Sequence, residues 1–325
     1  MSFEIGEFGN YQKLFKNRKR KNHGYIEKLN VTSGEINSNK YFQMVFIPKL
    51  SRNDIVKHRF TVRFEKHNEV DCMITITVNS QNDVHTLKSQ HDNSTVDKMC
   101  SEWLVEVLFR KNYQYKEVSL TLPTIFDWDT KESDGNMIFN LEINVDNRDN
   151  DIVNSWLSKF PCAVEILHIK SNQFPLELED SLCLRQSQGV KISGNVNINI
   201  QLIKNLNANV FIHRGERFKE FTLEEMKELW KYCYSLEKIK AMSLQQSTET
   251  NGRELINWII EMYGGGHVDN HDYYLGKKKE HILYCKTCVN EIKFGVFNIL
   301  KEAEMDSDKW FNEFNFRMRA ERVPV

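Results

Sequence analysis

The sequence predicts an α/β protein, an irregular leucine-rich-like array of helices and strands with a small N-terminal antiparallel sheet. Short runs in which apolar and polar residues alternate cluster between residues 41 and 92, as half-buried strands require. Beyond them, amphipathic helix patterns are each followed by a short strand pattern, with strand starts near 164, 189, 208 and 238. Such recurrence is typical of solenoids, whose units each bury one face against their neighbours.

These patterns divide the chain into four segments. Residues 1–40 are polar and basic and are expected to form an extended or mobile arm. Residues 41–92 are the small antiparallel β segment, and residues 93–250 are the helix-strand array. Residues 251–325 are expected to be a helical segment. Its last helix is expected over about 285–304, where apolar residues recur three or four positions apart.

Each element is predicted from its own pattern of apolar residues and from the residues that begin or end it. Period-two runs predict strands at 41–47, 60–64 and 72–78. Helix stripes with capping residues, Ser94 with Asp97 and Thr222 with Glu225, predict helix starts. The remaining helices and strands are expected, in chain order, at 94–108, 117–122, 152–160, 164–169, 189–193, 198–206, 208–213, 222–233, 239–242 and 253–263.

Composition indicates an intracellular protein, cytoplasmic or nuclear. The 44 Lys and Arg residues balance 45 Asp and Glu residues, giving a net charge of -1, so a chain-wide attraction to nucleic acid is not expected. No signal peptide or membrane span is recognisable. The seven cysteines are scattered and mostly lie in apolar runs, which is typical of buried reduced thiols. The basic run from Lys16 to Lys21 is interpreted as a solvated arm, with nuclear import or phosphate contact as the alternative.

One cluster has the residue types of a metal site. His267, His271, His281, Cys285 and Cys288 could supply the four nitrogen or sulfur ligands of a structural zinc ion. A lone Cys-x-x-Cys does not specify a site, however, so no metal or other cofactor is assigned. The alternative hypothesis for the whole chain uses this cluster and the basic arm in a nucleic-acid-associated or zinc-stabilised regulatory protein.

No motif indicates catalysis. Gly264 to Gly266 follow a helix pattern and predict a helix cap, since no phosphate-loop spacing surrounds them. Asp127 and Asp129 bracket Trp128 in what is interpreted as a solvated turn, with a docking loop as the alternative. The segment 213–217 is either an exposed recognition loop or an ordinary strand-to-helix connection. The sequence therefore predicts a non-enzymatic protein without catalytic residues.

The run from Asp151 to Leu244 resembles the type 2 F-box-associated domain of nematode proteins. The resemblance rests on the order of Ser155-Trp156-Leu157, the strand Val164 to Ile169, Gly189 to Gly194, Leu206 to Val210, the helix Phe221 to Trp230, and Leu236-Glu237-Lys238-Ile239. Trp103-Leu104, before the strand expected at 117, is similar to the upstream part of the same family.

The resemblance implies a surface that recognises protein partners, the substrate-recognition part of a ubiquitin ligase adaptor. Members of the family usually carry an N-terminal F-box, which binds the Skp1 adaptor of cullin ligases. Residues 1–50 contain neither a Leu-Pro-rich opening nor an amphipathic helical trio. Protein partners are therefore expected, and binding to nucleic acid or to a membrane is not. Skp1 and cullin are possible partners, but the absence of an F-box pattern argues against them.

Overall fold

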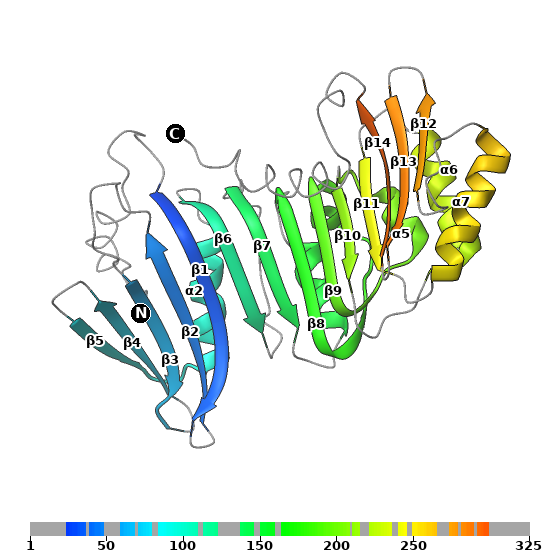
Figure 1. Cartoon of the computed structure of the whole chain (residues 1–325). Helices are drawn as coiled ribbons and strands as arrows, with labels where there is room; N and C mark the ends of the chain where they lie inside the picture. The colour runs from blue at the N-terminus through cyan, green and yellow to red at the C-terminus, as the bar shows by residue number, and fades with distance from the viewer. Residues whose placement is uncertain are drawn as a thin grey trace. The chain divides into compact units, whose positions relative to one another are not determined.

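The structure is a computed structural model of the whole chain (Figure 1). It describes residues 24–36, 39–48, 59–68, 71–79, 84–109, 113–122, 137–145, 150–159, 164–208, 210–214, 221–235, 240–245, 249–264, 273–278, 281–288 and 291–298. The chain divides into two compact units. The first comprises Met1–Leu176 and Asp180–Gln186, and the second comprises Glu177–Glu179 and Ser187–Val325. Both mix helices with parallel and antiparallel strands, so the predicted α/β class is confirmed.

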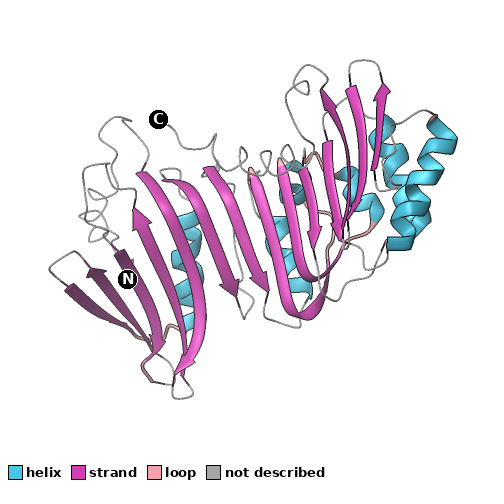
Figure 2. Ribbon diagram, in the orientation of Figure 1, coloured by secondary structure: helices cyan, strands magenta, loops and turns pink. Residues whose placement is uncertain are grey.

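The first unit is a mixed sheet with helices on one face (Figure 2). Its strand order is β8-β7-β6-β1-β2-β3-β4-β5. Strands β8, β7, β6 and β1 are parallel to one another, and β1 to β5 pair antiparallel in succession. The elements are β1 (Gly24–Ile36), β2 (Asn39–Pro48), β3 (Arg59–Lys66), β4 (Cys72–Asn79), β5 (Val84–His91), α2 (Val96–Phe109), β6 (Tyr113–Leu122), β7 (Met137–Val145), α3 (Asn150–Lys159), β8 (Ile166–Glu177) and α4 (Leu182–Gln186).

The N-terminal antiparallel strands lie where the sequence predicts them, but they are not a separate sheet. Strand β1 pairs antiparallel with β2 and parallel with β6, so it joins the two parts of the first unit. The expected arm is therefore wrong for residues 24–36, which form β1. The basic run from Lys16 to Lys21 lies outside the described residues.

Helix α2 packs on β2, β3 and β4 and closes the core of this unit. Leu104 and Leu108 are fully buried, and the rings of Phe64 and Trp103 meet edge to face with centroids 5.7 Å apart. The Tyr115 hydroxyl, from β6, donates a 2.6 Å hydrogen bond to the Val107 carbonyl. The apolar positions of these strands thus face the helix, which leaves their polar positions on the other face.

The alternation of buried residues breaks at one level of β1, β6 and β7. In β1, Glu27 and Lys28 are both half-buried between buried Ile26 and Leu29, and the register with β2 shifts there, as in a β-bulge. Strand β6 repeats the break at Lys116 and Glu117. Strand β7 repeats it at residues 139–140. Neighbouring strands therefore present two consecutive non-buried residues side by side.

The second unit contains the remaining helices and strands. Its strand order is β12-β13-β14-β11-β10-β9. Strands β9, β10 and β11 are parallel, whereas β11, β14, β13 and β12 pair antiparallel in that succession. The elements are β9 (Gly189–Asn197), α5 (Ile200–Asn205), β10 (Val210–Arg214), α6 (Leu223–Ser235), β11 (Lys240–Gln245), α7 (Glu249–Tyr263), β12 (Tyr273–Lys278), β13 (His281–Cys288) and β14 (Glu291–Asn298).

The expected C-terminal helix over about 285–304 is wrong. Residues 281–288 and 291–298 form the antiparallel strands β13 and β14, and β14 pairs with β11. These residues are rich in β-branched and aromatic types, with Gly295 in the middle of β14. Such a composition disfavours a helix and favours a strand once a partner strand is present.

One of the two predicted N-terminal helix caps is confirmed. The cap predicted at Ser94 is one residue early, because Thr95 caps α2 and its hydroxyl accepts from the Lys98 amide at 3.3 Å. At α6, the Thr222 hydroxyl accepts from the Glu225 amide at 3.2 Å, and the Glu225 carboxylate accepts from the Thr222 amide at 2.7 Å. This reciprocal pair is a capping box. Gly264 adopts a positive φ of 69° just after α7 and its amide donates to the Ile260 carbonyl at 2.9 Å, which confirms the predicted cap at that residue. No helix among the described residues is long and apolar enough to cross a membrane.

Candidate functional site on the polar face of the parallel strands

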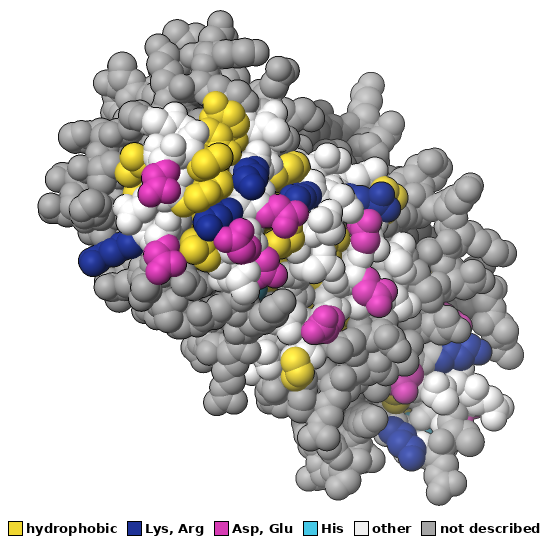
Figure 3. Space-filling view, turned by 90° about the vertical axis from the view of Figure 1, so that its right-hand side faces the viewer, with side chains coloured by type: hydrophobic (Ala, Val, Ile, Leu, Met, Phe, Trp, Pro, Cys, Tyr) yellow, Lys and Arg dark blue, Asp and Glu magenta, His cyan; other side chains and the backbone are white. Residues whose placement is uncertain are grey.

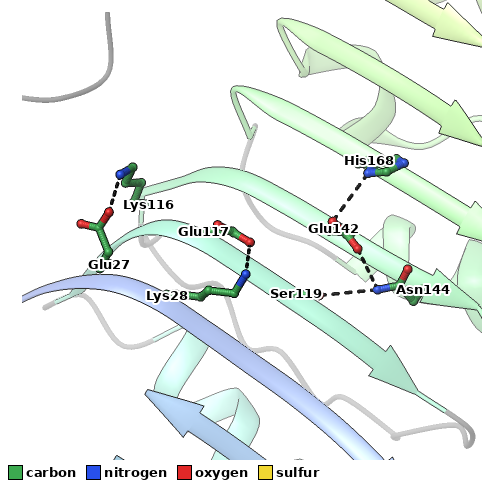
Figure 4. Close-up of polar contacts among 8 residues, drawn as sticks. All are labelled: Glu27, Lys28, Lys116, Glu117, Ser119, Glu142, Asn144 and His168. Atoms are coloured by element: carbon green, nitrogen blue, oxygen red, sulfur yellow. Dashed lines mark hydrogen bonds and ion pairs between the residues drawn. The ribbon is translucent and has the colours of Figure 1, made fainter. Parts of the chain in front are cut away.

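The parallel strands of the first unit carry charged side chains on the face away from the helices (Figure 4). Lys28 on β1 forms an ion pair with Glu117 on β6, and Lys116 on β6 forms another with Glu27 on β1. All four side chains are partly exposed. In these two ion pairs, β1 supplies the acid of one pair and the base of the other, and so does β6; we call them the crossed ion pairs. The broken alternation of β1 and β6 makes both pairs possible, because it places two consecutive polar residues of each strand on the surface.

A second group continues the face across β7 and β8. Glu142 is in register with Ser119 on one side and His168 on the other. The Asn144 amide donates to Glu142 Oε1 at 2.9 Å and to the Ser119 hydroxyl at 3.5 Å. His168 Nδ1 lies 3.6 Å from Glu142 Oε2. We use the name polar face for Glu27, Lys28, Lys116, Glu117, Ser119, Glu142, Asn144 and His168.

Glu142 is held as a carboxylate. Its hydrogen bond with His168 lowers the pKa of Glu142 from the ordinary 4.5 to about 2. Partial burial opposes this lowering, whereas the Asn144 amide and the nearby Lys170 ammonium add to it. The Glu142 side chain remains 37% exposed, so a partner can reach a carboxylate whose position is already fixed by its neighbours.

The polar face is suited to recognition by many polar contacts. It presents carboxylates, ammonium groups, an amide and an imidazole from four neighbouring strands, and rigid strands hold polar groups more accurately than loops do. Groups of both signs lie side by side, so a complementary partner surface must match their order. This favours a protein surface of mixed charge over a uniformly charged polymer.

The His/Cys cluster predicted from the sequence is not assembled in the described residues. His267 and His271 lie outside them. Cys285 is fully buried in β13, and burial raises the pKa of its thiol well above its ordinary value. The positions of Cys285 and Cys288, expected near a helix start, lie three apart on a strand, and such positions belong to opposite faces. No group of three or more His, Cys, Asp or Glu in the described part of the chain could hold a metal ion.

The segment 213–217 does not begin as a loop, because His213 and Arg214 are the last two residues of β10, in agreement with the strand expected at 208–213. His213 is the fourth residue of β10 and is buried; its Nε2 lies 3.1 Å from the Val196 carbonyl and its ring meets Phe221 edge to face. Burial lowers the pKa of His213. Residues 215–217, like Asp127 to Asp129, lie outside the described residues.

The described cysteines are structural in character. Cys72, Cys100, Cys183, Cys233 and Cys285 are buried thiols. Burial raises the pKa of Cys72 to about 11 and also raises that of Cys100. Since the thiolate is the reactive form, the thiols of Cys72 and Cys100 are poor nucleophiles and poor metal ligands.

A second mixed surface lies on α6 and α7 in the other unit (Figure 3). Lys227 and Lys231 lie over the ring of Trp258, at 5.7 and 5.5 Å from its centroid, and Met262 is exposed. Acidic side chains are interleaved with these groups in Figure 3. Because this surface carries both acidic and basic side chains, its charge does not favour an acidic partner over a basic one.

Sequence reasoning missed the polar face. Half of its members, Glu27, Lys28, Glu142 and Asn144, lie on β1 and β7, which the sequence patterns did not predict as strands. A search for apolar alternation interrupted by two consecutive polar residues would have found β1. Comparison of the chain with protein families, characterised proteins and solved structures found no significant match.

Proposed function

We propose that the chain is a non-enzymatic protein-protein interaction module that binds its partner through the polar face. The observation that carries the proposal is the continuous arrangement of partly exposed groups of both signs across β1, β6, β7 and β8. Ion pairs and hydrogen bonds fix these groups before any partner arrives. Pre-organised groups lose less side-chain entropy on binding.

The resemblance to nematode F-box-associated domains gives the proposal its biological class. In this class the module would be the substrate-recognition part of an F-box-type protein, with a curved leucine-rich-like sheet that presents the binding face. The proposed function is protein recognition, and a ligase link is an outcome of the experiment that follows. The buried thiols support a place inside the cell, in the cytoplasm or nucleus.

The test compares two arginine variants of the tagged full-length chain expressed in its source cells. Ser119→Arg introduces a long charged side chain into the polar face. Glu102→Arg introduces the same side chain at an exposed position of α2, away from that face. We expect quantitative mass spectrometry to find one or more proteins recovered with the wild type and with Glu102→Arg, and depleted about tenfold or more with Ser119→Arg. Circular dichroism of both purified variants checks that they fold.

Equal recovery of all partners by the two variants would contradict the proposal. If a partner is depleted only with Ser119→Arg, calorimetry with the purified partner tests direct binding. Binding to the wild-type chain and to Glu102→Arg, but not to Ser119→Arg, would support the proposal. Skp1 and cullin in the wild-type sample would add the ligase link, while their absence would remove that link and leave the recognition module.

A further inference from the structure

Glu142 differs from the other two carboxylates of the polar face in the kind of group that accompanies it. Glu27 and Glu117 each form an ion pair with a lysine of the neighbouring strand. The ion-pair partner of Glu142 is His168, whose Nδ1 lies 3.6 Å from Oε2 and which is charged only when it is protonated. Among the described residues, the negative charge of Glu142 therefore has no lysine or arginine in contact with it.

The other charges around Glu142 do not supply an excess of positive charge. Lys170 on β8 lowers the pKa of Glu142, but it is the smallest of the listed influences on that carboxyl. Glu117 on β6 is already paired, and Glu165 just before β8 is a further acid. Residues 146–149, which follow β7 and lie outside the described residues, contain two acids and one base. Charge complementarity therefore favours a cation from the partner at Glu142.

The groups beside Glu142 offer hydrogen-bond acceptors to such a cation. The Asn144 side chain turns its amide nitrogen toward Glu142 Oε1 and the Ser119 hydroxyl, at 2.9 and 3.5 Å, so its carbonyl oxygen points away from both (Figure 4). A hydroxyl oxygen and each carboxylate oxygen can accept more than one hydrogen bond. All three side chains are only half-buried, so a group with several N–H donors can reach them.

We propose that Glu142 binds an arginine side chain of the protein partner. This inference rests on the proposed function and names the chemistry that the partner brings to the polar face. A guanidinium group carries five N–H donors in a planar fork that fits the two oxygens of a carboxylate. The donors left over can reach the Ser119 hydroxyl or the Asn144 carbonyl. A lysine ammonium is a compact and strongly hydrated charge with three donors, so it fits such a set of acceptors less well.

An anionic group is a poorer occupant of this position. The pKa of about 2 keeps Glu142 ionised at neutral pH, so a carboxylate or phosphate of a partner would meet a like charge there. Like charges brought together across an interface weaken binding. The chemistry at Glu142 therefore selects a basic side chain over an acidic one.

The first experiment repeats the capture from source cells with the tagged full-length chain carrying Glu142→Gln. Glu102→Gln, the same change at an exposed position of α2, is the matched control. We expect the proteins that Ser119→Arg loses to fall about tenfold with Glu142→Gln and to be unchanged with Glu102→Gln. Circular dichroism of the purified variants checks that they fold.

The second experiment identifies the group that the partner supplies. The probe is the purified protein that the wild type recovers and Ser119→Arg loses, with its arginines blocked by cyclohexanedione or its lysines blocked by acetylation. In calorimetry with the wild-type chain, arginine blocking should weaken binding about tenfold or more, and lysine acetylation should weaken it less. Glu142→Arg should lose the unmodified partner, and binding should return when the arginine that the complex protects is replaced by glutamate.

The outcomes separate this inference from the proposed function. Full recovery with Glu142→Gln of the proteins that Ser119→Arg loses would overturn the inference and leave the proposed function standing. Full recovery with both variants would overturn both. Binding that survives arginine blocking, that is lost only on lysine acetylation, or that the charge exchange does not restore would overturn the assignment of an arginine. Loss with Glu142→Gln together with restoration by the charge exchange would support it.

Discussion

Strands β10 and β11 of the second unit bury residues on both faces, whereas the parallel strands of the first unit bury mainly one face. In β6, β7 and β8, buried and half-buried residues alternate along most of each strand. In β10 and β11, three consecutive residues are buried in each strand, 211–213 and 242–244. Alternating polarity preserves a face that stays in contact with water, and a continuous buried run does not. The difference indicates where this fold can receive a partner: on β1 and β6 to β8, and not on the middle of β10 and β11.

The largest expected effect comes from introducing one carboxylate into β10 and comparing it with one carboxylate introduced into β8. Ile212→Asp in β10 should lower the free energy of unfolding by about 4 kcal/mol, because it buries an unpaired carboxylate. Ile166→Asp at the start of β8, where the residue is only half-buried, should cost less than about 1 kcal/mol. Urea unfolding followed by circular dichroism measures both changes, and equal losses would contradict the two-class description of the strands.

Neighbouring residues of β6 provide the next test. Leu120→Ala should destabilise the fold by about 3 kcal/mol, since Leu120 is fully buried and its truncation leaves a cavity. Ser119→Ala, one position earlier on the polar face, should change stability by about 0.5 kcal/mol or less. The measurement is again the urea midpoint. A large loss for Ser119→Ala would show that the polar face is part of the core.

The acidity of Glu142 gives a pH-dependent test. Because its folded-state pKa of about 2 lies below the ordinary 4.5, the stabilisation is present above pH 4.5 and is lost as the pH falls toward 2. The group is more than a third exposed, so we expect only about 1 kcal/mol between wild type and Glu142→Gln at pH 6.

That gap should close as the pH falls from 4.5 toward 2. His168→Asn should reduce the pH dependence in the same window, because the His168 hydrogen bond is the largest cause of the lowered pKa. Unfolding curves at pH 6, 4 and 3 measure the gap, and a difference that stays constant with pH would contradict the assigned network.

The smallest expected effect is that of the crossed ion pairs. A double-mutant cycle with Lys28→Met and Glu117→Gln should give a coupling energy of about 0.5 kcal/mol, because both side chains are partly exposed. High salt should reduce it further. A coupling of several kcal/mol would indicate that this pair holds the strands together, and the pair would then be structural.

The elements that the sequence predicted correctly have strong local signals. Helix α6 begins where the Thr222 and Glu225 capping box places it, and the period-two runs of β3 and β4 fall on real strands. Strand β1 was missed because the bulge at Glu27 and Lys28 interrupts its alternation. The same bulge places Glu27 and Lys28 in the polar face. The interruption that made the strand hard to predict therefore also contributes two residues to the candidate site.

Other features depend on partners that are distant along the chain. The apolar residues of 285–304 fit a helical stripe, and only pairing with β11 selects the strands β13 and β14. Within the polar face, Lys28 and Glu117 are 89 residues apart, and Ser119 and Asn144 are 25 apart. No local pattern predicts that such pairs meet, because strand order determines it.

Lysine footprinting of the chain, free and bound to its purified partner, tests the central claim most directly. A small acylating reagent followed by mass spectrometry reports the accessibility of Lys28 and Lys116 on the polar face, Lys88 on the β5 edge and Lys98 on α2. We predict severalfold protection of Lys28 and Lys116 on binding and unchanged reactivity of Lys98. Unchanged reactivity of Lys28 and Lys116 in a saturated complex would contradict the claim that the polar face receives the partner.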